Sequence, residues 1–482
     1  MNPNIAANQQ RLFLAFVAEL RPHIGRDSAL PRRIKELFAR HRAIGSRDRK
    51  LYRELVYTYL RFLPWIDPLL DATPDLAAKI TAWLAPDVAR QRGDGQTAGL
   101  APTAGSEAGG AWSAGAPGAR TKQLRPTSAY RAAHCADWPA VPDTLAEKAA
   151  ALSTLTGGAR PPDALSSTRP EAGFHLPSSL SPQLLAAPKP SDGGSAFSFQ
   201  PSALLPAWFH SHCPAAFESP HLDALNSRAG VWVRIQCNDR ALVLDEFRAR
   251  QWTFDQPADF PDALCLPPNA EVAGSDAYRR GFIEIQDLGS QLVLACAPIT
   301  PGGRWLDACA GAGGKTLQLA RLLGDAGHVD ATDIRPDILD ELDDRAKRAR
   351  LDNITIVREP KGDYDGVLVD APCSGSGTWR RQPHLKWYIK PESITSFTKT
   401  QSEILDAHAP RVKPGGLLIY ATCSLSQHEN HDVVASFLSA HPQFKPEPSA
   451  DTHGGTFDGL GTLLLPGTRN TDGFYVALLR RA

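Results

Sequence analysis

Apolar positions in the first part of the chain recur at the spacing of one helix face. They fall three and four residues apart in two stretches: Leu12, Phe13, Phe16, Val17 and Leu20, then Leu51, Leu55, Val56, Tyr59 and Leu60. This periodicity is typical of amphipathic helices. It predicts a helical region over residues 1–85.

Beyond residue 276 the pattern changes to short apolar runs separated by helical segments. The candidate strands are residues 304–308, 328–332, 354–357, 366–369, 417–420 and 473–479. Alternating strands and helices predict an α/β domain over 276–482, with a mostly parallel sheet covered on both faces. Ligands of such sheets bind beyond the carboxyl ends of the strands, so the residues that follow each strand are the place to search for chemistry.

Composition separates these two regions. Of the thirty residues 91–120, sixteen are Gly or Ala. Such a composition cannot bury enough apolar surface to offset its chain entropy, so most of 86–200 is predicted to be disordered, except for a short helix over 143–156 capped by Asp143. Residues 201–275 regain globular character, and 231–235 reads as a strand, which predicts a small α+β linker domain.

Charge is balanced overall but not locally. The 482 residues include 52 Lys and Arg and 52 Asp and Glu, which excludes a uniformly basic protein. Residues 1–65, however, contain 13 basic and five acidic residues. Two interpretations stay open: a solvated helix surface, or a surface that faces the phosphates of a nucleic acid.

Several classes of protein are disfavoured. No apolar run approaches the length of about 18 residues that a membrane span needs, and the N-terminus lacks the pattern of a signal peptide. The eight cysteines are scattered without a CxxC pair, which indicates neither a zinc site nor a disulfide framework. We therefore expect a cytoplasmic protein without membrane contact or metal, in which any important cysteine acts as a thiol.

The first candidate strand leads into a glycine-rich turn, Asp307-Ala308-Cys309-Ala310-Gly311-Ala312-Gly313-Gly314-Lys315-Thr316. A Walker A loop would need glycine at Cys309, and a dinucleotide loop would need a small residue at Thr316, so neither fits. The second strand ends in Asp333, an acid that suits the hydroxyls of a ribose. Turn and acid together predict a cofactor that contains adenosine. The alternative is a plain tight turn with a helix-capping aspartate.

Two cysteines follow later strands. One stands in Asp370-Ala371-Pro372-Cys373-Ser374-Gly375 and the other in Thr422-Cys423-Ser424. A free cysteine is most often a small buried apolar residue. In polar, glycine-bearing loops at the ligand side of a sheet, a thiolate can instead act as a covalent nucleophile.

Basic and aromatic residues alternate in the segment 379–388, which reads Trp-Arg-Arg-Gln-Pro-His-Leu-Lys-Trp-Tyr. Such a segment suits a splayed single strand, with cations on phosphates and rings on bases. The alternative is a surface loop whose cations reach into solvent.

Together these motifs resemble the RNA 5-methylcytosine methyltransferases of the RsmB/Nop2/Sun family. The similarity covers about 275–482, including Gln286-Asp287-Leu288-Gly289-Ser290-Gln291 and Thr471-Asp472-Gly473-Phe474-Tyr475. More weakly, Ser46-Arg47-Asp48-Arg49 and the residues after it look like the NusB-like RNA-binding domain of the bacterial ribosomal-RNA members. The resemblance implies a Rossmann-like domain that depends on S-adenosylmethionine.

The resemblance also implies roles for individual residues. The cofactor would be held by Cys309, Ala310, Gly311, Ala312, Gly313, Gly314, Lys315, Asp333 and Asp370, with Glu359 as a substitute for the family's adenine-end aspartate. Cys423 would be the nucleophile and Cys373 would assist product release. Asp370 and Lys315 would bind the flipped cytosine.

We therefore expect a monomeric methyltransferase that acts on C5 of a cytosine in RNA, with 16S ribosomal RNA as the substrate. A transfer-RNA methyltransferase and a non-catalytic RNA-binding assembly factor are the alternatives. A P-loop NTPase is disfavoured by Cys309. A DNA cytosine methyltransferase is disfavoured because its Pro-Cys thiol would leave Cys423 without a role.

Overall fold

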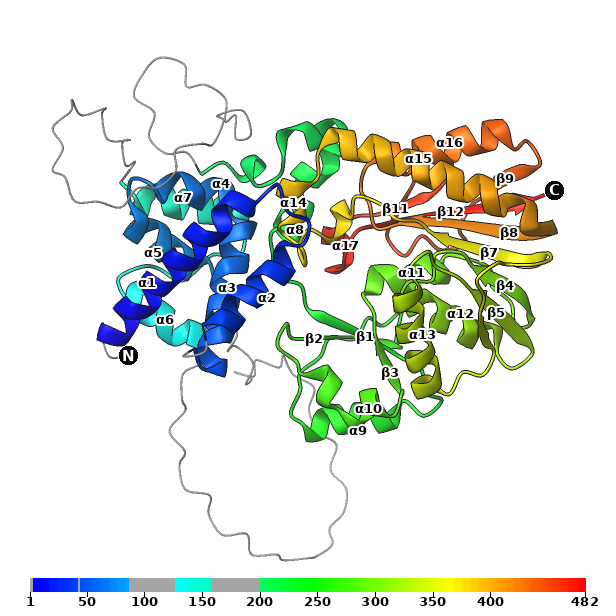
Figure 1. Cartoon of the computed structure of the whole chain (residues 1–482), viewed down its shortest axis with the longest axis horizontal. Coiled ribbons are helices and arrows are strands. Elements are labelled where there is room, and N and C mark those ends of the chain that lie inside the picture. The colour runs from blue at the N-terminus through cyan, green and yellow to red at the C-terminus, as the bar shows by residue number, and fades with distance from the viewer. Residues whose placement is uncertain (1–2, 42–43, 86–125, 158–198) are drawn as a thin grey trace, which may run out of the picture.

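The computed structural model describes residues 3–41, 44–85, 126–157 and 199–482. A helical unit lies at one end of the molecule and a large sheet flanked by helices at the other, with a small sheet between them (Figure 1). None of the helices in the described ranges is long and apolar enough to cross a membrane.

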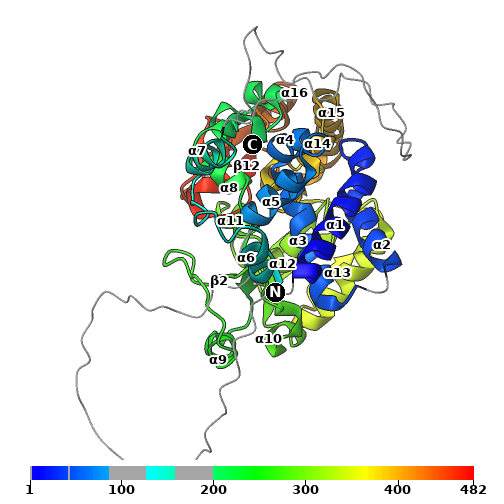
Figure 2. The ribbon, with the colours of Figure 1, turned by 90° about the vertical axis from the view of Figure 1, so that its left-hand side faces the viewer.

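The helical unit confirms the helices predicted from periodicity. It contains α1 (Pro3–Leu20), α2 (Leu30–Arg40), α3 (Ser46–Arg61), α4 (Leu63–Ile66), α5 (Pro74–Leu84), α6 (Pro126–His134) and α7 (Leu145–Leu155). Phe13, Phe16, Leu55 and Tyr59 are buried in one shared core. Figure 2 looks onto this end of the molecule, where α1, α3 and α5 lie side by side.

Part of the predicted disordered region is folded. Tyr130 of α6 is buried in the core of the helical unit, so the disorder prediction is wrong for 126–142. The helix predicted over 143–156 is confirmed as α7, whose Leu145 and Leu152 are buried in the same core. The residue that caps α7 is Thr144, which forms a capping box with Glu147, and not the predicted Asp143. Residues 86–125 and 158–198, which include the Gly/Ala-rich stretch, lie outside the described residues.

The segment 199–225, which follows the gap 158–198, joins the helical unit and not the linker domain. It forms short helices η4 (Pro201–Leu204), η5 (Ala207–Ser211), η6 (Pro214–Phe217) and α8 (His221–Leu225). Leu204, Phe209 and Leu225 are buried with the residues of α1 and α3. Sequence periodicity could not reveal this, because short 3-10 helices contain too few residues to show a repeating apolar pattern.

The linker region is built on a three-stranded antiparallel sheet. Its order is β2 (Ala263–Leu266), β1 (Val231–Ile235) and β3 (Ile283–Ile285), with α9 (Ala241–Ala249) and α10 (Asp276–Arg279) packed beside it. The third strand lies beyond residue 275, where the sequence placed the end of this region, because its partner β1 is far away in the chain.

The C-terminal sheet has nine strands. It contains β4 (Gly303–Asp307), β5 (Gly327–Ala331), β6 (Ile354–Ile356), β7 (Tyr364–Asp370), β8 (Val412–Thr422), β9 (Phe444–Glu447), β10 (Thr456–Phe457), β11 (Thr462–Leu464) and β12 (Phe474–Arg481). The main path is β10-β11-β12-β8-β7-β4-β5-β6, and β4 to β8 are parallel. All six predicted strands are confirmed within a few residues.

Helices cover both faces of this sheet, because successive side chains of a strand point to opposite sides. The helices are α11 (Leu288–Ala295), α12 (Gly314–Leu323), α13 (Pro336–Ala349), α15 (Pro391–His408) and α16 (His431–Ala440). Two short helices lie outside these layers: α14 (Leu385–Tyr388) packs on the helical unit and α17 (Pro466–Arg469) on α8. Val367 and Val369 of β7 pack with Leu405 of α15 and Val434 of α16. Leu368, between them, packs on the other face with Leu319 of α12. The two helix layers are visible above and below the sheet in Figure 1.

Candidate active site

The strand order brings the predicted site residues together at one edge of the sheet. β7 lies between β4 and β8, with Asp307 opposite Leu368 and Asp370 opposite Ala421. The loops that follow these three strands therefore leave the sheet side by side. They carry the glycine-rich turn, Asp370 with Cys373, and Cys423.

Lys315 and Asp370 form an ion pair in this cluster. The Lys315 ammonium donates to the Asp370 carboxylate at 2.8 Å, and the lysine side chain is 7% exposed. Lys315 reaches this position because α12 begins directly after Gly313, which has a φ of 90°. A Cβ on Gly313 would meet side-chain atoms of Leu317 and Leu342 at 2.8 Å, so the turn needs glycine.

The two cysteines that the sequence singled out lie next to each other. Their Sγ atoms are 3.3 Å apart, and both thiols are free. Contact with the Cys423 thiol, burial and the nearby Glu429 raise the pKa of Cys373 well above its ordinary value. Cys373 is therefore a protonated thiol at neutral pH, beside a second thiol.

Glu429 supports both cysteine loops and was missed by the sequence analysis. Its buried carboxylate accepts hydrogen bonds from the Ser374 amide at 2.8 Å, the Ser424 hydroxyl at 2.6 Å and the Gln401 amide at 3.1 Å. Ser374 follows Cys373, and Ser424 follows Cys423. Burial raises the pKa of Glu429, although the hydrogen bonds oppose this shift. The only signal in the sequence is an acid six residues after Cys423, on a turn with no apolar pattern.

Asp333 lies against the glycine-rich turn. It accepts from the Gly311 amide at 2.9 Å and from the Arg335 guanidinium at 3.0 Å. Burial raises the pKa of Asp333, but these hydrogen bonds outweigh it and the net shift is downward. A charged carboxylate therefore stands beside the turn, and the neighbouring Ile334 is 95% exposed.

The other predicted cofactor residues also follow parallel strands of this sheet. Cys309, Ala310, Ala312 and Gly314 belong to the turn between β4 and α12. Burial, with the nearby carboxylates, raises the pKa of Cys309 far above its ordinary value, so this thiol stays protonated. Glu359 follows β6 and is exposed, with no hydrogen bond to the turn among the described residues.

The basic and aromatic segment 379–388 does not present its side chains to solvent as predicted. Trp379, Arg380, His384 and Lys386 are at most 3% exposed. Trp379 packs on Phe209 with ring centroids 4.7 Å apart, and Lys386 donates to the backbone oxygen of Arg61 at 3.0 Å. This segment therefore joins the helical unit to the large sheet. The interpretation as a surface loop with solvated cations is wrong, whereas contact of its arginines with RNA stays a prediction.

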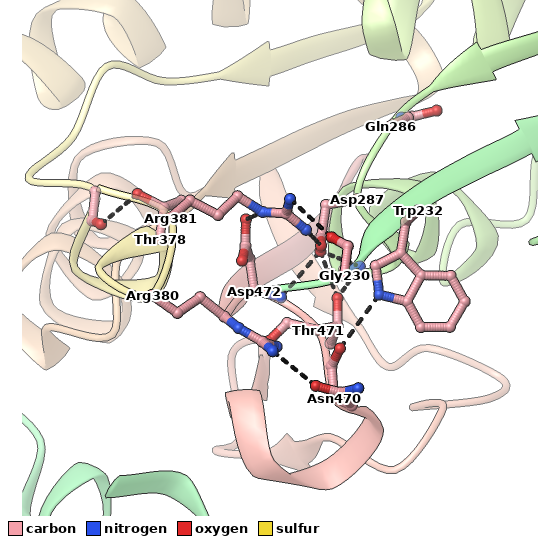
Figure 3. A network of polar contacts seen from close by, with 12 residues as sticks. Gly230, Trp232, Gln286, Asp287, Thr378, Arg380, Arg381, Asn470, Thr471 and Asp472 are labelled. Carbon is pink, nitrogen blue, oxygen red and sulfur yellow. Dashed lines mark hydrogen bonds and ion pairs between the residues drawn. The ribbon is translucent and has the colours of Figure 1, made fainter. Parts of the chain in front are cut away.

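Arg381 ties this segment to two of the motifs near the sheet. It forms ion pairs with Asp287, which begins α11, and at 2.8 Å with Asp472 (Figure 3). Asp287 also accepts from the Thr471 hydroxyl and, at 3.0 Å, from the Asp472 amide. Burial and the charge of Asp287 raise the pKa of Asp472 to about 7. The terminal motif therefore serves to hold the loops of the site together.

Residues 294–480 match the family model described as 16S rRNA methyltransferase RsmB/F. This part of the chain resembles that family. Two ribosomal RNA small subunit methyltransferase B proteins are also similar to the chain. The one from Vibrio vulnificus (strain YJ016) is 32% identical over 268 residues, or 54% of the chain and 61% of the relative. The one from Salmonella paratyphi C (strain RKS4594) is 34% identical over 293 residues, or 57% and 66%. The chain thus spans less than two thirds of their length.

Two solved structures share the fold of this chain. The crystal structure of PH0851 has a TM-score of 0.60 at 20% identity and covers 100% of this chain and 99% of its own. NSun6 from Pyrococcus horikoshii, crystallised with SFG, has a TM-score of 0.52 at 16% identity and covers 57% of this chain and 96% of its own. The glycine-rich turn, the charged Asp333 and the exposed Ile334 fit the uncharged nucleoside portion of S-adenosylmethionine.

Proposed function

We propose that this protein transfers a methyl group from S-adenosylmethionine to C5 of a cytosine in RNA, with 16S ribosomal RNA as the substrate. The observation that carries the proposal is the pair of thiols 3.3 Å apart beside the Lys315–Asp370 ion pair. The names of the similar proteins, which are methyltransferases of small-subunit ribosomal RNA, favour that RNA over transfer RNA.

The residues of the glycine-rich turn, with Asp333, would hold the cofactor. The ribose hydroxyls would take the place of the Arg335 guanidinium on Asp333, because the arginine side chain is 59% exposed and can move away. Bound S-adenosylmethionine supplies an electrophilic methyl group on a sulfonium. Asp370 and Lys315, paired at 2.8 Å, would orient the flipped base.

Two thiols fit a reaction that needs both addition and elimination. Cytosine C5 is a weak nucleophile, so the Cys423 thiolate would add to C6 and form a C–S bond, which makes C5 enamine-like. C5 would then take the methyl group as its bond to the sulfonium sulfur breaks, which leaves a neutral thioether. A base would next take the C5 proton, the C–S bond to Cys423 would break and the thiolate would be regenerated. We assign Cys373 to this elimination, because its thiol contacts Cys423 directly.

The test is a denaturing gel with labelled RNA and S-adenosylmethionine. Cys423→Ala should abolish methyl transfer and form no covalent adduct. Cys373→Ala should still attack but fail to release, so that a denaturation-resistant protein–RNA complex accumulates. An adduct with Cys423→Ala but not with Cys373→Ala would reverse the assignment, and full methylation by both variants would exclude covalent catalysis.

A further inference from the structure

A cavity of about 280 Å³ lies where the three parts of the molecule meet. It is lined by five arginines from separate segments: Arg53 and Arg61 of α3, Arg228 just before β1, and Arg380 and Arg381 of the joining segment. Glu54 is the one carboxylate in the lining. Figure 3 shows Arg380 and Arg381 side by side near Gly230, a further lining residue.

Acidic side chains neutralise only part of this charge. Glu54 pairs with Arg228 at 3.0 Å, and Asp287 and Asp472 pair with Arg381. Among the described residues, no carboxylate lies within ion-pair distance of Arg53, Arg61 or Arg380. Arg61 donates to the backbone oxygen of Arg380 at 3.2 Å, and Arg380 donates to neutral oxygens of Ser227, Asn470 and Thr471.

Two of these guanidinium groups also lack part of their hydrogen bonding. The Nε atoms of Arg61 and Arg380 are buried and have no hydrogen-bond partner among the described residues. The two residues are only 4% and 1% exposed. Burial, together with the charges of Arg228 and Arg380, lowers the pKa of Arg61 to about 10. Buried cations that are neither paired nor fully hydrogen-bonded cost free energy, which a bound anion would offset.

We propose that this cavity binds a phosphate group of the RNA backbone. Arginine forks match the paired oxygens of a phosphodiester, and arginines from three segments can surround one. The cavity is coupled to the catalytic loop: Arg380 holds the Thr471 carbonyl at 3.1 Å, the Gly473 amide donates to Gly377 at 3.0 Å, and the Gly377 amide donates to the Cys423 carbonyl at 2.9 Å. A phosphate held here would fix the register of the strand that enters the site.

The experiment measures the affinity of the full-length protein for a single-stranded RNA as a function of salt. Arg53→Gln removes an exposed cation at the rim, and Arg228→Gln removes one inside, so at least one variant should keep the fold. Arg248→Gln is the control, because it removes an exposed arginine of α9 that pairs with Asp245 and lies outside the cavity. Each cavity variant should bind RNA several-fold more weakly, and its slope of log K against log salt should fall by about 0.7.

A second arm uses inorganic phosphate, in place of chloride at equal ionic strength, to raise the melting temperature. Phosphate should stabilise the wild type and the control but not the cavity variants. Stabilisation that depends on the arginines, with unchanged RNA affinity, would assign the cavity to a free anion and overturn the RNA proposal. No effect in either arm would show that the cavity binds no phosphate.

This inference rests on the proposed function only in naming RNA as the polymer whose phosphate is bound. Binding of S-adenosylmethionine and methyl transfer at saturating RNA are measured on the same variants. Retained methyl transfer with unchanged RNA affinity would reject the cavity alone. Absent methyl transfer in the wild type, with arginine-dependent RNA binding, would reject the proposed reaction and leave the cavity assignment intact.

Discussion

Glu429 connects the two cysteine loops through the residues next to the thiols, and not through hydrogen bonds to the thiols themselves. Its carboxylate accepts from Ser374, Ser424 and Gln401, so it fixes the residues that follow Cys373 and Cys423. A glutamine at this position presents an amide NH₂ to groups that are themselves donors. We therefore regard Glu429 as a positioning residue.

Glu429→Gln should slow methyl transfer on the order of 100-fold, because small displacements of reacting groups have effects of that size. The affinity for S-adenosylmethionine should not change, since Asp333 and the glycine-rich turn are untouched. Steady-state kinetics and calorimetric titration measure the two effects. Asp432→Asn, on the nearby surface of α16, is the control. An unchanged kcat for Glu429→Gln would remove this residue from the positioning of the thiols.

Asp307 should make the stability of the protein depend on pH. It is buried and accepts from the Thr316 hydroxyl at 2.7 Å. Burial, with the nearby Asp370, raises its pKa from 3.8 to about 7. In the unfolded chain the carboxyl loses its proton near 3.8, whereas the folded protein holds the proton to about 7. Stability from this group is therefore present below pH 4 and is lost as the pH rises towards 7.

Asp307→Asn cannot ionise, so it should not show this loss. The free energy of unfolding of the variant, relative to the wild type, should rise between pH 4 and 7 by a few kcal/mol. Urea titrations across this range measure it, and Asp340→Asn, which removes an exposed carboxyl on α13, should show no such trend. A difference that does not depend on pH would contradict the raised pKa.

At the scale of elements, the contact between α3 and the segment 379–388 decides how the helical unit is attached. Lys386 is fully buried, and its ammonium donates to the backbone oxygens of Arg61 and Leu204 and to the Asn226 side chain at 3.0, 3.1 and 2.7 Å. Trp387 adds a hydrogen bond to the backbone oxygen of Leu60 at 2.7 Å. One lysine therefore joins three segments that are distant in the sequence.

Lys386→Met should separate the unfolding of the helical unit from that of the large sheet. The substitution leaves three acceptors without their donor, at a cost of about 1–3 kcal/mol for each buried group. Scanning calorimetry should show a transition at lower temperature that the wild type lacks. Lys399→Met, on the exposed side of α15, should leave the thermogram unchanged. A single transition at the wild-type temperature in Lys386→Met would show that the hydrogen bonds of Lys386 do not stabilise the protein.

For the whole molecule, two deletions of similar size should change the melting temperature by very different amounts. Removing 126–157 takes Tyr130, Leu145 and Leu152 out of the core of the helical unit and removes the Trp83 hydrogen bond to Pro139 at 2.8 Å. The loss of several buried side chains should lower the melting temperature by roughly 10 °C or more. Removing 91–120 should change it little, because a stretch of Gly and Ala can bury almost nothing. Equal shifts would contradict this difference.

The sequence by itself determined the parts of this protein that depend on local periodicity and local chemistry. Six strands of the large sheet, the helices α1 and α3, the glycine-rich turn and both cysteine loops are each specified by adjacent residues. Parallel topology then places the loops after these strands at one edge. That is why Lys315, Asp370, Cys373 and Cys423 could be predicted to meet.

Only the tertiary structure decided which polar residues are buried. The segment 379–388 and the cations of α3 look in the sequence like a surface for nucleic acid, yet Arg61, Arg380 and Lys386 are enclosed because neutral oxygens from distant segments surround them. Glu429 and the arginine cavity have the same origin. Contacts between segments hundreds of residues apart leave no periodic pattern, so their partners, and hence their burial, come from the packing of the whole chain.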